Sequence, residues 1–173
     1  MAMRGIQIGL RVWEFIWTLL IMALVGNMIA EAFAGNPAIV NYTMFVVAFS
    51  MLSLFYLVPA SINMDWAIHP ILVIIVDTLN MLLFFTCAIA FAAILQAHSC
   101  SNEDYTLNNE ITNGSDNPEK RCREAQASTA FLWFAWAGYA ASWILSIIMS
   151  RSAGANLRPR TGPVRGRPSM AQV

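Results

Sequence analysis

The sequence predicts an all-α membrane protein, a four-transmembrane-helix up-down bundle with both termini in the cytosol. Its 173 residues are 58% hydrophobic and only 12% charged, whereas soluble globular domains carry about 25% charged residues. The apolar residues are also gathered into four long runs. A compact soluble domain of this length has too little interior to bury so much apolar surface. The chain is therefore predicted to fold in a membrane.

The four apolar runs are each long enough to cross a bilayer as a helix. They cover residues 12–30, 40–60, 70–96 and 127–150, and a hydrocarbon core of about 30 Å needs about 20 helical residues. Only helices and closed barrels satisfy the backbone in lipid, and the runs lack the alternating pattern of barrel strands. Residues 1–150 are therefore predicted to form one four-helix transmembrane domain.

The first run also has features of a secretory signal peptide. Arg4 and Arg11 precede it, and the small-residue motif Ala32-Phe33-Ala34 follows it. The apolar cores of signal peptides are typically about 7–15 residues long. Because this run is longer, it is interpreted as a retained helix, and cleavage is the alternative.

The connections between the runs predict sequential antiparallel helices. Gly35-Asn36-Pro37 is a tight-turn sequence, and Pro70 suits the first turn of the third helix. A longer polar loop covers residues 98–124. Residues 151–173 form an Arg-rich tail without hydrophobic periodicity, which is predicted to be disordered.

The positions of Lys and Arg predict the orientation, because these residues accumulate in cytosolic segments near helix ends. Two arginines precede the first run and five lie in the tail, whereas the loop 98–124 holds three basic residues. Four helices place both ends of the chain on one side of the membrane. That side is predicted to be the cytosol, and the loop 98–124 is predicted to lie outside.

The long loop carries two cysteines and a glycosylation sequon. Cys100 and Cys122 lie on the side of the membrane where disulfides persist. Asn113 begins an Asn-Gly-Ser sequence and is a possible glycosylation site. A metal site formed by His98 and the two cysteines is the alternative, but it would lack a fourth ligand. A disulfide is favoured, and no metal or cofactor is predicted.

The third run contains an intramembrane polar patch formed by Asp77 and Asn80, one helical turn apart. Ionisable residues at this depth are rare and usually face a bundle interior. No Lys, Arg or His lies inside the four runs, so Asp77 is predicted to be a neutral residue that hydrogen-bonds between helices. A lipid-headgroup or conformational switch and a proton or ion relay are the alternatives. The candidate hydroxyl partners are Thr18, Ser50, Ser53 and Ser142.

Two further groups of residues are predicted to hold helices together. In the fourth run, Gly138, Ser142 and Ser146 recur at every fourth position and predict a helix-packing seam, within the bundle or between protomers. Near the start of the first run, Arg11 and Glu14 are three residues apart and predict an ion pair at the membrane interface.

The arginines of the tail predict contact with the anionic lipids of the inner leaflet, where each basic residue contributes about 1 kcal/mol. These residues are Arg158, Arg160, Arg165 and Arg167. The alternative is that they only fix the orientation of the chain. The basic stretch is short and lies beside a membrane, so no nucleic-acid partner is predicted. No catalytic motif is present in the sequence, and no enzymatic activity is predicted.

Several segments of the chain resemble a known family. They are Asp77-Thr78-Leu79-Asn80, Ala97-His98-Ser99-Cys100, Ile111-Thr112-Asn113-Gly114-Ser115, Arg121-Cys122-Arg123, Ala125-Gln126-Ala127 and the terminal Gln172-Val173. These segments are similar to the fungal non-classical export proteins, which belong to the MARVEL-domain group of four-helix membrane proteins. The resemblance implies a plasma-membrane protein of eisosomes, the furrow-like domains of the fungal cell cortex. It also implies a role in organising those domains in response to sphingolipid state.

The functional prediction that follows is a plasma-membrane organiser of eisosome-type domains. Its expected partners are the lipids of a sphingolipid- or sterol-rich domain, the anionic inner leaflet, and either further copies of the chain or cortical eisosome proteins. The alternative is a small transporter or a component of non-classical protein export, in which Asp77 and Asn80 line a path.

Overall fold

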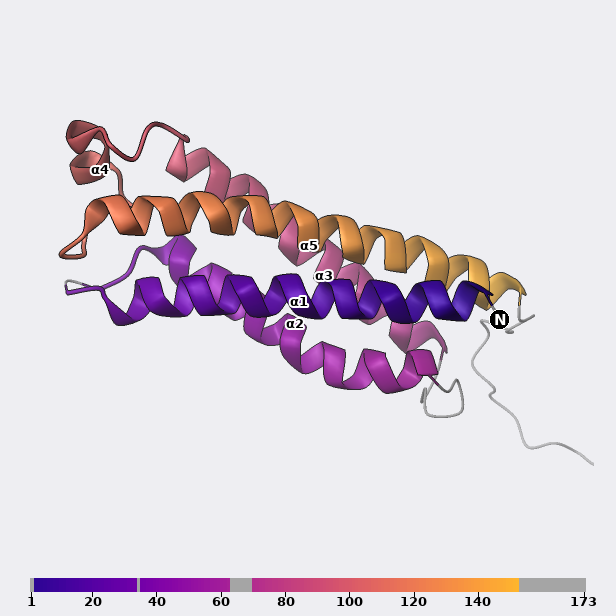
Figure 1. Cartoon of the computed structure of the whole chain (residues 1–173). Helices are drawn as coiled ribbons and strands as arrows, with labels where there is room; N and C mark the ends of the chain where they lie inside the picture. The colour runs from indigo at the N-terminus through magenta and orange to yellow at the C-terminus, as the bar shows by residue number, and fades with distance from the viewer. Residues whose placement is uncertain (1, 34, 63–69, 153–173) are drawn as a thin grey trace, which may run out of the picture.

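Four long helices form an elongated bundle in a computed structural model of the chain, which describes residues 2–33, 35–62 and 70–152 (Figure 1). The long helices are α1 (Ala2–Ala30), α2 (Ala38–Ile62), α3 (Pro70–Leu95) and α5 (Pro118–Ser152). The short helix α4 (Glu103–Asn108) lies in the connection between α3 and α5. The tail beyond Ser152 lies outside the described residues, so its predicted disorder stays a prediction.

Each long helix packs against two neighbours. Helix α1 packs against α2 and α5, and α3 also packs against α2 and α5, so α1 and α3 face each other across the bundle. The short helix α4 and the loops beside it lie at the end opposite the N-terminus (Figure 1). All four long helices are long and apolar enough to cross a membrane. The predicted four-helix membrane bundle is therefore confirmed.

Two helices begin earlier than the hydropathy predicts. Helix α1 begins at Ala2 rather than near residue 12, because residues 2–11 contain no proline and continue directly into the apolar run. Helix α5 begins at Pro118 rather than near residue 127, since proline is well suited to a first helical turn. The Asn117 side chain caps this helix by accepting a hydrogen bond of 3.0 Å from the Lys120 amide. Hydropathy marks only the lipid-embedded part of a helix and misses polar turns beyond it.

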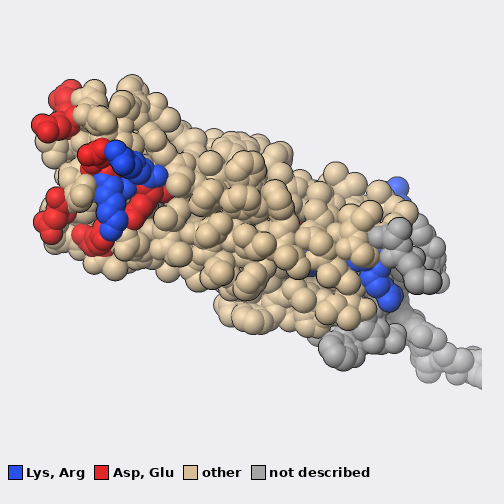
Figure 2. All heavy atoms as spheres, in the orientation of Figure 1, with Lys and Arg blue, Asp and Glu red and all other residues tan. Residues whose placement is uncertain are grey.

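The outer surface of the bundle is apolar along the middle of the helices. Phe55 and Leu52 of α2 are 73% and 70% exposed, and large exposed apolar surface of this kind is stable against lipid rather than water. On the face shown in Figure 2, charged side chains gather at the two ends of the bundle, and the band between them carries almost none. The described chain is thus a multi-pass membrane protein.

The interior of the bundle has an apolar half and a polar half. Towards the α4 end the core is hydrophobic, with Phe84 of α3 stacked on Tyr139 of α5 at a centroid distance of 5.3 Å. Towards the N-terminus of α1 the buried side chains are mostly polar or charged. They are Gln7, Arg11, Glu14, Asp77, Ser142, Ser146 and Ser150. The polar half therefore holds the buried side chains that can form ion pairs and hydrogen bonds between helices.

Candidate functional site

The centre of the polar half is a buried ion pair between opposite helices. The Arg11 guanidinium on α1 donates from Nη1 to Asp77 Oδ1 at 2.7 Å and from Nη2 to Asp77 Oδ2 at 2.8 Å. Arg11 is 1% exposed and Asp77 is fully buried. Two parallel bonds of this kind match the planar fork of a guanidinium to a carboxylate. The pair therefore joins α1 to α3 across the bundle.

This geometry corrects the prediction that Asp77 is a neutral residue with no cation near it. Because α1 begins ten residues before its apolar run, Arg11 lies on a continuous helix and reaches the interior. The sequence holds a signal for this placement. Gln7, Arg11, Glu14 and Thr18 recur at spacings of four, three and four, which places them on one helical face. All four side chains are buried.

Glu14 adds a second carboxylate to the ion pair. Arg11 Nη1 also donates to Glu14 Oε2 at 2.9 Å. The predicted pair of Arg11 and Glu14 does form, and because Glu14 is fully buried, the pair lies inside the bundle. Arg11, Glu14 and Asp77 are named the charge cluster from here on.

The remaining helices bind the charge cluster through neutral polar groups. Ser146 of α5 donates to Asp77 Oδ2 at 3.0 Å, and Gln7 of α1 donates to Ser146 Oγ at 3.4 Å. Arg11 Nε donates to Ser61 Oγ of α2 at 3.4 Å. All four long helices therefore meet at Arg11 and Asp77.

The predicted polar patch of Asp77 and Asn80 is divided between two networks. The Asn80 amide donates to Ser53 Oγ of α2 and to the Val76 carbonyl, each at 2.9 Å. The hydroxyl that bonds Asp77 is Ser146, which differs from the four candidates that the sequence offered. Of those candidates, Thr18 and Ser50 lie 3.3 Å apart and bond each other. Asn80 thus joins α3 to α2, separately from the charge cluster.

The predicted seam on α5 faces α1 within the bundle. A Cβ atom on Gly138 would lie 2.8 Å from Trp13 Cδ1 and 3.3 Å from Glu14 Cγ. The Trp13 indole is fixed there by a hydrogen bond of 3.0 Å to the Phe134 carbonyl. Ser142 follows Gly138 by one helical turn on the same face of α5 and is fully buried. The small residues therefore let α5 approach the side chains around the charge cluster.

The loop at the α4 end is held by a disulfide and by a buried arginine. Cys100 and Cys122 are joined with a Cα–Cα distance of 5.6 Å, as the sequence predicted. Arg121, which the sequence did not single out for this role, is 1% exposed. It donates from Nε to the Ile111 carbonyl at 2.7 Å and from Nη2 to Asn36 Oδ1 at 3.1 Å. Arg121 thus fixes the loop against the connection between α1 and α2.

The structure also bears on the predicted glycosylation site, on metal binding and on the surface charges at this end. Asn113 is exposed, and its glycosylation stays a prediction. Residues 2–33, 35–62 and 70–152 contain no group of three potential metal ligands. Lys120 pairs with Glu31, and this hydrogen bond holds the pKa of Glu31 below its ordinary value. The four tail arginines predicted to contact lipid lie outside the described residues.

The fold and the charge cluster together define a small multi-pass membrane protein. Its four spanning helices are joined, within the described residues, by a buried network of ion pairs and hydrogen bonds. The chain belongs to the MARVEL family, because the model of that family, described as a membrane-associating domain, matches residues 2–145. The resemblance to MARVEL-domain proteins found in the sequence is therefore confirmed.

Curated relatives place the chain among fungal members of this family. It is 38% identical over 165 residues to "Non-classical export protein 102" of Candida albicans, and the match covers 95% of each chain. It is 33% identical over 173 residues to "Non-classical export protein 2" of Saccharomyces cerevisiae, again covering 95% of each chain. The Schizosaccharomyces pombe homolog of the latter is 27% identical over 134 residues, covering 77% of this chain and 72% of the relative. These names are those of export proteins rather than enzymes. No solved structure matches the chain.

Proposed function

We propose that this protein organises eisosome-type domains of the plasma membrane through lateral packing and lipid contacts, and that it responds to sphingolipid state. Membership in a family of membrane-associating domains supports the proposal. The charge cluster is the observation that carries it. Arg11 and Asp77 occupy the centre of the polar half and use their hydrogen bonds to close the four helices on one another. The surface that remains for function is the apolar outside of the bundle and its ends.

The test of this proposal is the distribution of the fluorescently tagged full chain in fungal cells. We expect stable cortical patches that coincide with eisosomes and that change in number or occupancy when sphingolipid synthesis is blocked. The acceptor for lateral packing is either a further copy of the chain or a cortical eisosome protein, and crosslinking in the patches identifies which. A uniform plasma-membrane signal that does not respond to sphingolipid depletion would refute the organiser role.

A second candidate function is a component of non-classical protein export, or a small transporter. The names of the relatives from Candida albicans and Saccharomyces cerevisiae favour the export role. An assay in proteoliposomes that contain only the purified chain distinguishes the two candidate functions. Flux of a defined solute or an exported protein would favour the second candidate, whereas vesicles that stay sealed and a protein that clusters laterally would favour the organiser.

The proposed function also depends on the orientation of the chain. We propose that both termini are cytosolic and that the disulfide-bonded loop is extracellular. A reporter fused after Val173 should then be cytosolic, and a glycosylation tag between Cys100 and Cys122 should be modified. An extracellular reporter at Val173 would overturn the orientation that the basic residues predict.

The tail arginines are proposed to bind the anionic inner leaflet. Replacing Arg158, Arg160, Arg165 and Arg167 by glutamine removes about 1 kcal/mol of leaflet attraction for each residue near the surface. Arg151, in the last turn of α5, is kept to anchor the helix end. We expect correct insertion with altered clustering. Inverted insertion would show that the arginines set orientation, and unchanged clustering would remove the lipid contact.

A further inference from the structure

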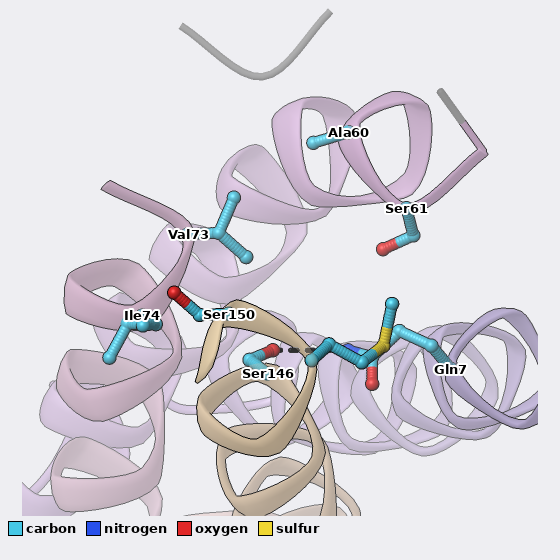
Figure 3. A pocket seen from close by; sticks show the side chains of 8 residues that line it. Gln7, Ala60, Ser61, Val73, Ile74, Ser146 and Ser150 are labelled. Carbon is cyan, nitrogen blue, oxygen red and sulfur yellow. Dashed lines mark hydrogen bonds between the residues drawn. The ribbon is translucent and has the colours of Figure 1, made fainter. Parts of the chain in front are cut away.

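A small pocket lies beside the charge cluster, at the end of the bundle where α1 begins. Its volume is about 40 Å³, which exceeds the roughly 10–15 Å³ that one water needs. Gln7 of α1, Ser61 of α2 and Ser146 and Ser150 of α5 line it with polar groups, and Val73 and Ile74 of α3 are part of its apolar wall (Figure 3). The Ser150 hydroxyl points toward these two α3 side chains (Figure 3). The pocket therefore combines an apolar wall with hydrogen-bonding groups from three helices.

Two polar atoms of this pocket have no hydrogen-bond partner within the described part of the chain. They are Gln7 Oε1 and Ser150 Oγ, although Gln7 is only 3% exposed and Ser150 only 5% exposed. Buried polar atoms are almost always satisfied in native proteins, because leaving one unpaired costs its full desolvation. Gln7 and Ser150 both line the pocket, so a group bound there is the available partner for these atoms.

The hydrogen-bond network determines whether the unpaired atom of the Gln7 amide is a donor nitrogen or an acceptor oxygen. The Asp77 carboxylate that faces Arg11 only accepts hydrogen bonds, so the single hydroxyl proton of Ser146 goes to Asp77. Ser146 can therefore only accept from Gln7, and it is the Gln7 amide nitrogen that faces it, at 3.4 Å. The other end of the Gln7 amide is then a carbonyl oxygen, which accepts. The missing partner must supply a hydrogen-bond donor.

The described lining of the pocket favours a neutral partner over an anionic headgroup. None of the described side chains that line the pocket is charged. The nearest cation that the network reaches is Arg11, which already donates to Asp77, Glu14 and Ser61. A phosphate would therefore find no free cation in the lining, and its unprotonated oxygens would offer no donor to Gln7. A neutral donor, such as a hydroxyl or an amide N–H, fits both requirements.

The depth of the pocket fits a membrane lipid. Gln7 precedes the end of α1 at Ala30 by 23 residues, since 30 minus 7 is 23, and this is about 35 Å of helix at 1.5 Å per residue. The hydrocarbon core of a bilayer is about 30 Å thick. If α1 ends near one surface, Gln7 lies at the headgroup level of the other, where an amphipathic molecule has its polar group beside apolar chains.

We propose that this pocket binds a neutral membrane lipid, whose headgroup hydroxyl or amide donates to Gln7 Oε1 and bonds Ser150 while its apolar part lies against Val73 and Ile74. The inference rests on the proposed lipid contacts of the organiser and names the site and the chemical class. The bound headgroup is linked to the charge cluster through Gln7, Ser146 and Asp77. Lipid occupancy thereby stabilises the contact of α1 with α5 at this end of the bundle.

The test uses the purified full chain in phosphatidylcholine nanodiscs that contain a photoactivatable diacylglycerol, a neutral lipid with one free hydroxyl. The comparison lipid is its O-methyl ether, which has the same chains and lacks the donor. We expect crosslinks on the ends of α1 and α5 that line the pocket, and about fivefold less crosslinking with the ether, the loss that one hydrogen bond supplies. Equal crosslinking by the two lipids, or none by either, would overturn the proposal.

Two variants and a matched control assign the binding to the pocket. Ser150→Ala should lower crosslinking by about fivefold, and because the Ser150 hydroxyl has no partner in the described chain, this change should not disturb folding. Gln7→Met should lower it at least as much. Ser128→Ala is the control. Ser128 also lies on α5, is also buried and has no hydrogen-bond partner among the described residues, but it precedes Ser150 by 22 residues (150 minus 128). Wild-type crosslinking in Ser150→Ala would refute the site even if Gln7→Met fails to fold.

A second readout separates this inference from the proposed function. Diacylglycerol should raise the thermal midpoint of the wild-type chain and of Ser128→Ala, but not that of Ser150→Ala, because a ligand stabilises the state to which it binds. Loss of lipid binding in Ser150→Ala together with normal cortical patches would leave the organiser role intact without this pocket. Normal lipid binding in a chain that forms no patches would contradict only the organiser role.

Discussion

Replacing Arg11 by methionine is the most direct test of the charge cluster. Methionine keeps an unbranched apolar stem of similar reach, and it leaves the carboxylates of Asp77 and Glu14 buried without a cation. The wild-type guanidinium donates three bonds of 2.7 to 2.9 Å to these carboxylates, and both acceptor residues are fully buried. Breaking a buried ion pair by removing one partner costs about 3–5 kcal/mol. We expect Arg11→Met to lower the free energy of unfolding by this amount.

Changes at Asp77 should follow a different order. Asp77→Asn keeps a carbonyl oxygen that accepts from Arg11, and Glu14 remains to neutralise the guanidinium, so we expect a loss of about 1.5 kcal/mol, the low end for a hydrogen bond to a charged group. Asp77→Leu removes every acceptor and should cost more. Arg4→Met is the matched control, because Arg4 lies on the same helix and is exposed. Surface substitutions usually change stability by about 0.5 kcal/mol or less.

The assay is reversible unfolding of the purified chain in mixed micelles titrated with a denaturing detergent, followed by circular dichroism. The singles are combined in a double-mutant cycle of Arg11→Met and Asp77→Leu, because residues in direct contact couple by about 0.5–3 kcal/mol whereas distant residues add. The double variant should be more stable than the sum of the single losses predicts. Strict additivity, or an Arg11→Met chain as stable as Arg4→Met, would show that the ion pair across the bundle does not form.

Three further outcomes follow from the packing, the disulfide and the outer charges. Gly138→Ala should lower stability by about 1–3 kcal/mol through overpacking against an indole ring, whereas Gly9→Ala, with nothing within 4 Å of its Cβ, should not; equal melting of the two variants would contradict the close approach. Joint replacement of Cys100 and Cys122 by serine should cost about 3 kcal/mol in the chain-entropy model for a separation of 22 residues, measured as a lower thermal midpoint that reductant no longer changes. Because its lysine partner lowers the pKa of Glu31 below 4.5, that pair contributes stability above the ordinary value and loses it as the pH falls through the lowered one. At low salt the midpoint of the wild-type chain should therefore fall more in acid than that of Glu31→Gln.

The sequence by itself determined the class of fold and the covalent constraint at one end. Hydropathy alone defines four spanning helices, because lipid requires about 20 consecutive apolar residues and tolerates no unpaired backbone. Cys100 and Cys122 are the two cysteines of one loop, and the bond between them needed no knowledge of packing. Both predictions rest on local composition, which a sequence states directly.

Only the tertiary structure decided which helix faces meet and therefore what Asp77 bonds. Apolar residues surround these helices on every side, so a hydrophobic face cannot mark the inward one, as it does in water-soluble bundles. The boundary of α1 mattered most, since a helix that began at residue 12 would have left Arg11 outside the bundle. Once α1 begins at Ala2, the Gln7–Arg11–Glu14 stripe turns inward and meets Asp77 of α3 and Ser146 of α5. A buried charge in lipid is tolerated only when it is paired, and that pairing depends on residues 66 positions apart in the chain.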